Sequence, residues 1–257
     1  MKVLVIGDSC LDVFVYGNVD RICPEAPVPV INPVDVKEND GMALNVVNNL
    51  RSLGVETDSI TNSTLIEKVR YIDDKTNQML LRMDTYDRCD RCNLTGIRWD
   101  EYNAVVISDY NKGFLEEEDI EIICRSHSTV FMDTKKRLGD WAKDANYIKL
   151  NQYEYKDSKP YIESSTDLED KLIVTYGDKG CYYKGKYYPP ENMVEVKDAC
   201  GAGDTFLSAF AVHMVKYNNI EGAIAFAQQC AGDVVSKRGV VVTKLQEQSS
   251  LFDKGIL

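Results

Sequence analysis

The sequence predicts an α/β protein in which a parallel sheet is covered by helices on both faces and a small antiparallel sheet stands beside it. Short apolar runs rich in valine and isoleucine recur along the chain, as expected of buried parallel strands. Segments of helical period follow or separate them, so the strands should be joined by right-handed crossovers. Two further segments alternate apolar and polar residues, which is typical of antiparallel strands.

The first strand is expected at 2–7, where an apolar run ends in Gly7-Asp8. Comparable runs occupy 104–108, 129–133, 147–150 and 172–175, and segments of helical period occupy 42–53, 116–125, 204–216 and 220–237. Ligands of such sheets bind beyond the carboxyl ends of the strands. Several of those ends carry polar side chains, namely Asp8, Asp12, Asp109, Asp133, Asn151 and Glu154.

The alternating segments are 13–36 and 67–84, and the second should form a hairpin that turns at 74–77. We interpret them as a lid that can cover a substrate. The alternative is an antiparallel extension of the main sheet. A chain of 257 residues has room for one main domain and a small appendage, so we expect a single domain over 1–257.

Composition narrows the classes of function. The net charge of −11 and the pI near 4.8 argue against a nucleic-acid-binding protein, which would present a basic surface. Eight scattered cysteines and an N-terminus without a signal-peptide pattern predict a reduced, cytoplasmic protein, and no apolar stretch is long enough for a membrane span. Cys89 and Cys92 lack a second pair, so we expect no metal or redox site there.

The motif at 198–204, Asp-Ala-Cys-Gly-Ala-Gly-Asp, carries the most functional information. Small residues let backbone N–H groups converge on an oxyanion, and the helix that follows adds the positive end of its dipole. Asp204, in the first turn of that helix, is placed to accept a proton from an attacking hydroxyl. The alternative is an ordinary strand-to-helix turn in which Asp204 only favours the helix dipole.

With these features, the chain resembles the ribokinase-like (PfkB-type) carbohydrate kinases, and within them the D-glycero-β-D-manno-heptose-7-phosphate kinases. The matching segments are 7–12, 16–17, 21–30, Asn45, 52–54, 81–84, 108–113, 133–135, 151–154, 174–175 with Gly180, and 198–204. The resemblance implies a three-layer α/β/α sandwich with a β lid, the cofactors ATP and Mg²⁺, and a heptose 7-phosphate that is converted to the 1,7-bisphosphate for surface polysaccharide synthesis.

The resemblance also implies roles for individual residues. Asp204 would be the catalytic base, with Gly201, Ala202 and Gly203 stabilising the transferred phosphoryl group through their N–H groups. Asn151 and Glu154 would hold the water shell of Mg²⁺; read without the resemblance, they form a helix capping box.

The remaining residues concern the two substrates. Asp12 and Asn45 would bind sugar hydroxyls, and Arg82, Asp109 and Lys135 would lie on the substrate side, where Arg21 and Lys112 are further candidate cations for a phosphate. Thr175, Gly177 and Gly180 would line the nucleotide loop, although the two glycines also fit ordinary turns.

Three departures from the family pattern affect these expectations. Met42 replaces a glycine before the sugar-contacting Asn45, which puts the choice of sugar in question. The connection 54–68 is short, so we expect a trimmed sheet edge. Neither His127 nor His213 begins an H-x-G-H motif, so the protein should phosphorylate without adenylylating. The alternatives are a kinase for another sugar or a non-catalytic nucleotide-binding relative, and exposed lid strands suggest a homodimer formed through the lid.

Overall fold

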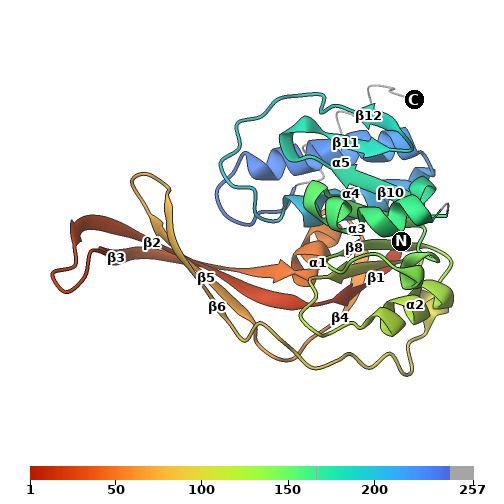
Figure 1. Cartoon of the computed structure of the whole chain (residues 1–257), viewed down its shortest axis with the longest axis horizontal. Helices are drawn as coiled ribbons and strands as arrows, with labels where there is room; N and C mark the ends of the chain where they lie inside the picture. The colour runs from red at the N-terminus through yellow and green to blue at the C-terminus, as the bar shows by residue number, and fades with distance from the viewer. Residues whose placement is uncertain (166, 244–257) are drawn as a thin grey trace.

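The computed structural model describes residues 1–165 and 167–243, and an eight-stranded sheet forms its centre (Figure 1). The strand order is β12-β11-β10-β9-β8-β7-β1-β4. The parallel strands are β1 (Lys2–Gly7), β4 (Glu56–Thr61), β7 (Ala104–Asp109), β8 (Val130–Thr134), β9 (Tyr147–Asn151) and β10 (Leu172–Thr175). The short antiparallel strands β11 (Cys181–Tyr183) and β12 (Lys186–Tyr188) extend one edge.

Helices cover both faces of this sheet. Val3 and Val5 of β1 pack in the core beneath α1 (Ala43–Ser52), α4 (Ala202–Tyr217) and α5 (Ile220–Val235). Leu4 and Ile6 point the other way, into the core shared with α2 (Glu117–Ser126) and α3 (Gln152–Ser164). This alternation along each buried strand produces the predicted three-layer α/β/α sandwich.

A second, four-stranded sheet projects from the main body and forms the lid (Figure 1). Its order is β3-β2-β5-β6, with β2 at Ser9–Ile22, β3 at Pro29–Met42, β5 at Glu67–Asp73 and β6 at Met79–Thr85. The prediction of a wholly antiparallel lid is wrong for one pair, because β2 and β5 are parallel. These two strands continue outward from β1 and β4, which are themselves parallel, so they leave the main sheet in the same direction.

The sheet differs from expectation in two further places. Within the short connection 54–68, β4 is an edge strand that was not predicted, and it pairs with β1 along its whole length before the chain enters β5. The hairpin of β11 and β12 was not predicted, since three-residue strands are too short to show a period. Within the described residues, no helix is both long and apolar enough to cross a bilayer.

Candidate active site

Polar side chains gather where the parallel strands end and α4 begins. Asp8 follows β1, Tyr110 follows β7, and Lys135 follows β8. Asn151 is the last residue of β9, and the first turn of α4 contains Asp204. The residues therefore come from five separate segments, and the parallel sheet brings them to one edge, as the sequence predicts.

Asp204 is a buried carboxylate that receives two neutral hydrogen-bond donors. Asn45 Nδ2 donates to Oδ2 at 2.8 Å, and the Tyr110 hydroxyl donates to Oδ1 at 2.8 Å. The Asn45 amide is itself oriented by Asn49, whose Nδ2 donates to Asn45 Oδ1 at 3.1 Å. Each carboxylate oxygen has two lone-pair directions, so Asp204 keeps the capacity to accept a further hydrogen bond from a substrate hydroxyl.

Burial raises the pKa of Asp204 to about 6, while the hydrogen bonds from Asn45 and Tyr110 act in the opposite direction. The negative charge of Asp133 adds to the rise, and the ammonium group of Lys149 reduces it. A carboxylate with this pKa is ionised at neutral pH and is still basic enough to take a proton in a transition state. The geometry therefore suits a general base.

The glycines before Asp204 have identifiable structural causes. Gly201 is the N-cap of α4 with φ 78°, a left-handed conformation that favours glycine, and a Cβ there would lie 2.6 Å from Asn45 Nδ2. At Gly203, a Cβ would lie 2.8 Å from Lys149 Nζ. The N–H groups of Ala202, Gly203 and Asp204 begin the helix, where the first N–H groups lack intrahelical acceptors. This end of α4 can bind an anion.

A buried ion network lies beneath that turn. Lys149 Nζ is 2.6 Å from Asp133 Oδ2, and Lys135 Nζ lies 3.2 Å from Asp133 Oδ1 and 2.5 Å from Glu154 Oε1. Burial opposes the ionisation of Asp133, but the two lysines together lower its pKa below the ordinary value. Burial disfavours the charge on Lys135, yet Asp133 and Glu154 raise its pKa. Lys135 is therefore held as a cation, and Lys149 lies beside the helix end, next to Gly203.

Asn151 and Glu154 form a complete capping box at the start of α3. Asn151 Oδ1 accepts the N–H groups of Tyr153 and Glu154 at 2.8 and 3.0 Å, and Glu154 Oε2 accepts the Asn151 N–H at 2.7 Å. The structural alternative considered from the sequence is thus present. Glu154 Oε1 also accepts Asn151 Nδ2 and Lys135 Nζ, so one lone pair of Oε2 is left to accept a hydrogen bond from water around a magnesium ion.

Asp8 organises the loop that carries Tyr110. Its carboxylate, fully buried, accepts backbone N–H groups of Tyr110 at 2.6 Å, Lys112 at 3.1 Å and Phe114 at 3.4 Å. Burial, aided by the charge of Asp109, raises the pKa of Asp8, whereas these N–H donors lower it. The end of β1 thereby fixes where the Tyr110 hydroxyl meets Asp204.

The lid brings further charged residues to the site. Asp12, 7% exposed, is bound by Arg70 at 2.5 Å, and Arg82 binds Asp84 through two hydrogen bonds of 2.7 and 2.6 Å. Asp12 and Arg70 lie on the face of the lid that also carries Phe14 and Tyr16, which pack against Val240 of the main body. The charge of Asp12 also raises the pKa of Arg82, although the carboxylate of Asp84 is the larger cause.

Asp109 has a different environment from the other predicted substrate ligands. It is 1% exposed, and its oxygens are bound by Lys136 at 2.8 and 3.0 Å and by Thr134 Oγ1 at 2.5 Å. The Asn111 N–H donates to Oδ1 as well, at 3.0 Å. These contacts join the ends of β7 and β8, which is a structural function for this carboxylate.

The predicted nucleotide residues follow β10. Thr175 Oγ1 donates to Leu150 O at 3.2 Å, which leaves its side chain at the strand end. Gly177 has φ 63° and nothing within 4 Å of an added Cβ, so this position faces open space. At Gly180 a Cβ would lie 2.2 Å from Tyr188 O, so packing against the β11–β12 hairpin alone requires glycine there.

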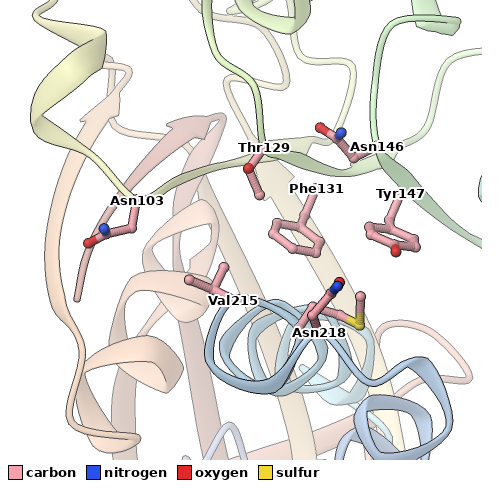
Figure 2. A pocket seen from close by; sticks show the side chains of 8 residues that line it. Asn103, Thr129, Phe131, Asn146, Tyr147, Val215 and Asn218 are labelled. Atoms are coloured by element: carbon pink, nitrogen blue, oxygen red, sulfur yellow. The ribbon is translucent and has the colours of Figure 1, made fainter.

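Two cavities have linings that do not include Asp204. The first, of about 400 Å³, is lined by Asn103, Thr129 and Asn146, which directly precede β7, β8 and β9, together with the end of α4 (Figure 2). It therefore lies at the edge of the sheet opposite the catalytic groups. The second, of about 480 Å³, lies near the ends of β7 and β8 and includes Asn111 and Lys135. Only the second adjoins the candidate site.

Sequence reasoning missed three residues of this region. Tyr110 lies in a matched segment, Lys149 in a predicted apolar strand and Lys68 in the predicted segment 67–84, and the sequence alone indicates no role for any of them. The lysine inside the apolar run 147–150 was an available signal, since a charged side chain in a buried strand needs a partner. No comparable signal marked Lys68, because its surroundings come from distant segments.

The comparisons with known proteins concern the family and the fold of the chain. The model of the pfkB carbohydrate kinase family matches residues 116–247. The chain is 31% identical to the bifunctional protein HldE of Nitratiruptor sp. over 96% of its length, and 30% identical to HldE of Helicobacter pylori over 98%. It spans 64% and 66% of those two proteins, about two thirds of their length.

Solved structures show the same fold. The ribokinase of Thermotoga maritima superposes with a TM-score of 0.71 at 17% identity, covering 98% of this chain and 99% of the other. The nucleoside kinase of Methanocaldococcus jannaschii gives a TM-score of 0.70 at 18% identity, covering 98% of each chain. At such identities the likeness concerns the fold. The family match, which covers more than half of the chain, shows that the chain belongs to the pfkB family of carbohydrate kinases.

Proposed function

We propose that the protein transfers the γ-phosphoryl group of ATP to a sugar phosphate, and that the sugar phosphate is D-glycero-β-D-manno-heptose 7-phosphate, which becomes the 1,7-bisphosphate. The observation that carries the chemistry is Asp204, a buried carboxylate of raised pKa in the first turn of a helix that opens with a glycine-rich turn. The similarity to the HldE proteins over nearly the whole chain supports the heptose.

In this mechanism Asp204 accepts the proton of the sugar's anomeric hydroxyl as its oxygen attacks the γ-phosphorus. The bond from the γ-phosphorus to the β–γ bridging oxygen breaks, and ADP leaves with its electron pair. Asn45 and Tyr110 hold the carboxylate in place and stabilise its charge before the transfer. The N–H groups of Gly201, Ala202 and Gly203 bind the oxygens of the migrating group, where negative charge is spread in the transition state. Lys149, beside Gly203, adds positive charge to the same end of α4.

Magnesium would accompany the nucleotide. Among residues 1–165 and 167–243, no group of three or more His, Cys, Asp or Glu side chains is arranged to cage a metal. Glu154 Oε2, held in place by Asn151, offers one oxygen donor near the anion-binding turn, which fits an ion that keeps most of its own water. When bound, the ion neutralises charge on the nucleotide phosphates. Thr175 and Gly177, at the end of β10, would border the nucleotide.

On the sugar side, Asp12 and Asn45 would bind hydroxyl groups, and Arg82 and Lys135 would lie near the phosphate that the substrate already carries. Arg70 supports this arrangement, since its guanidinium fixes Asp12 while leaving other carboxylate lone pairs free. For Asp109 we propose the structural role described above, because its oxygens are bound by Lys136, Thr134 and Asn111.

A coupled ADP-release assay over a panel of sugars tests the proposal. The panel should contain heptose 7-phosphate, the same heptose without phosphate, ribose and fructose 6-phosphate. We expect the highest kcat/KM with heptose 7-phosphate. Preference for another sugar would keep the kinase chemistry and reject the heptose, whereas no turnover together with tight ATP binding would support a non-catalytic relative.

We also propose a homodimer formed through the lid. Val36, Leu81 and Met83 alternate with the residues that face the site, and their exposures are 53, 57 and 46%. An exposed apolar face on a small sheet is typical of a contact surface, and two copies related by a twofold axis would cover each other's face. The main body offers no equivalent cover, because the opposite face of the lid is the one turned toward it.

Light scattering tests the dimer. The wild type should have the mass of two chains, and Leu81→Glu should have the mass of one. Ile122→Glu is the matched control, because Ile122 is 51% exposed on α2, far from the lid, and should leave the mass unchanged. A wild-type monomer would reject the proposal.

A further inference from the structure

A second buried charge lies beside the catalytic group. Lys68, on β5, is only 6% exposed, and its Nζ lies 3.1 Å from Met42 Sδ and 5.2 Å from the centroid of the Tyr110 ring. The hydroxyl of that ring donates to Asp204. The ammonium group of Lys68 is thus one aromatic ring away from the proposed base.

The carboxylates nearest to Lys68 are already bound by arginines. Register places Asp12 and Asp84 directly opposite Lys68 on the neighbouring strands β2 and β6. Arg70 binds Asp12 at 2.5 Å, and Arg82 binds Asp84 through both of its oxygens. In the described part of the chain, no carboxylate oxygen lies within 4.0 Å of Lys68 Nζ.

The contacts that Lys68 does make are neutral. They are the thioether of Met42, the face of Tyr110 and the nearby thiol of Cys10, whose pKa Lys68 helps to lower against the larger effect of burial. Lys135 lies 5.1 Å from the centroid of the same Tyr110 ring, but it has Asp133 and Glu154 as partners. A buried ammonium group without an anion is unfavourable, and a bound anion would remove that cost.

Met42 contributes to this arrangement in an unusual way. It has φ 59° and ψ −129°, a conformation that a side chain adopts only under strain, and it is 3% exposed. Its thioether sulfur lies 3.1 Å from Lys68 Nζ, so the side chain fills the space next to the ammonium group. The methionine that replaces the expected glycine thus shapes the surroundings of the lysine.

From this geometry we infer that Lys68 binds the phosphate group of the sugar substrate and so selects phosphorylated over unphosphorylated sugars. The inference builds on the kinase activity proposed above and adds a specificity-determining residue. An ammonium-to-phosphate contact is a charge-assisted hydrogen bond and is available only to a substrate that carries the anion. An uncharged sugar leaves Lys68 without a partner.

The test compares Lys68→Met with Lys75→Met. Methionine keeps the length and the apolar stem of Lys68 without its charge, and Lys75 is an exposed lid lysine that pairs with Asp20. For Lys68→Met we expect KM for heptose 7-phosphate to rise about 100-fold, with kcat and the KM for ATP within a few-fold of wild type. Turnover of the unphosphorylated heptose should not change, and Lys75→Met should match the wild type with both sugars.

Thermal unfolding supplies a second readout that does not need turnover. Removing an unpaired buried charge should leave Tm unchanged or higher, whereas a lysine needed for folding would lower Tm when replaced. Inorganic phosphate at millimolar concentration should raise the wild-type Tm by roughly 2 °C or more, and the rise should be clearly smaller in Lys68→Met, which keeps only the anion-binding end of α4. Equal phosphate shifts in both proteins would overturn the inference.

These outcomes separate the inference from the proposed function. If no sugar is phosphorylated, the proposed function fails, and the phosphate-induced shift alone decides the role of Lys68. If the wild type prefers the unphosphorylated heptose, the kinase chemistry stands and the inference is rejected. A loss of the same size on both sugars in Lys68→Met also rejects it.

Discussion

The strand-end cluster around Asp204 and the lid around Lys68 balance their buried charges in opposite ways. At the strand ends, Asp133 and Glu154 have lysine partners, while Asp204 has only the neutral donors Asn45 and Tyr110. In the lid, the buried carboxylate of Asp12 has an arginine partner, Arg70, whereas the contacts of the buried cation Lys68 are with neutral groups.

This difference indicates which groups are available to a ligand. In a buried ion pair, each charge is already satisfied, so the pair mainly fixes structure. A buried charge with only neutral neighbours is unfavourable until a substrate supplies what it lacks: a proton for Asp204 and an anion for Lys68. The two lie on different sides of Tyr110, whose ring contacts Lys68 and whose hydroxyl contacts Asp204. Variants of the strand-end cluster around Asp204 should therefore alter kcat or stability, and variants of the lid around Lys68 should alter KM for the sugar.

The largest effect is expected for Asp204→Asn. Loss of the base should lower kcat by roughly 10²–10⁴-fold, and ATP affinity, measured by calorimetry, should stay near the wild-type value. The free energy of unfolding, unlike kcat, should not fall in this variant. The folded-state pKa of about 6 exceeds the ordinary 3.8, so the folded protein binds more protons between these values and loses stability as pH rises through them.

The dependence of stability on pH provides a control for the same variant. The difference in pKa corresponds to about 3 kcal/mol at pH 8, a cost that asparagine avoids. Asp204→Asn should consequently unfold at the same or a higher temperature than the wild type at pH 8. Wild-type kcat in a folded Asp204→Asn protein would remove Asp204 as the base.

The next effect concerns the stability of the strand-end cluster. Lys149→Met removes the 2.6 Å partner of Asp133 and leaves only Lys135, at 3.2 Å, so the loss of this charged hydrogen bond should cost about 1.5–3 kcal/mol in urea unfolding. Lys75→Met removes an exposed lid lysine and should not measurably change stability, because its pair with Asp20 is solvated. Equal losses in the two variants would contradict the distinction between the regions.

The sequence predicts the main sheet and the position of Asp204 because both depend on local patterns. Buried strands show as valine- and isoleucine-rich runs, and the carboxyl ends of parallel strands must meet at one edge. The Gly-Ala-Gly turn is likewise local, since Gly201 needs its φ of 78° and Gly203 leaves space for Lys149. Asn45, 159 positions from Asp204, was reached only through the family resemblance.

The surroundings of Tyr110 and Lys68 depend on long-range geometry that local patterns do not encode. Tyr110 reaches Asp204 because Asp8, 102 positions away, binds the N–H group of Tyr110. Lys68 is buried because β5 pairs in parallel with β2, and alternation of apolar and polar residues predicts a strand without specifying its partner or direction. The burial of Lys68 and the parallel pairing of β2 with β5 were therefore missed for the same reason, because both depend on which strand is the partner of β5.

In the lid, Asp12→Asn tests the expected effect on substrate affinity. An amide oxygen binds sugar hydroxyls more weakly than a carboxylate, so KM for the sugar should rise about 10–100-fold with a much smaller change in kcat. Asp35→Asn is the matched control, since Asp35 is an acidic lid residue whose side chain is 55% exposed. A change confined to kcat would place Asp12 with the catalytic groups instead.

The smallest effect is expected for Tyr110→Phe, which removes the hydroxyl and keeps the ring beside Lys68. Asp204 acts as a base only when ionised, so kcat/KM should rise with pH through about 6 and then level off. The Tyr110 hydroxyl lowers the pKa of Asp204, and its loss should move this rise to higher pH by about half to one unit. Tyr102→Phe, which removes a comparable bond to Asp58 away from the site, should leave the profile unchanged. KM for the sugar phosphate should stay constant, because the contact between Lys68 and the ring is preserved. If the rise in kcat/KM moved to lower pH instead, the hydroxyl would have to donate to another group during catalysis.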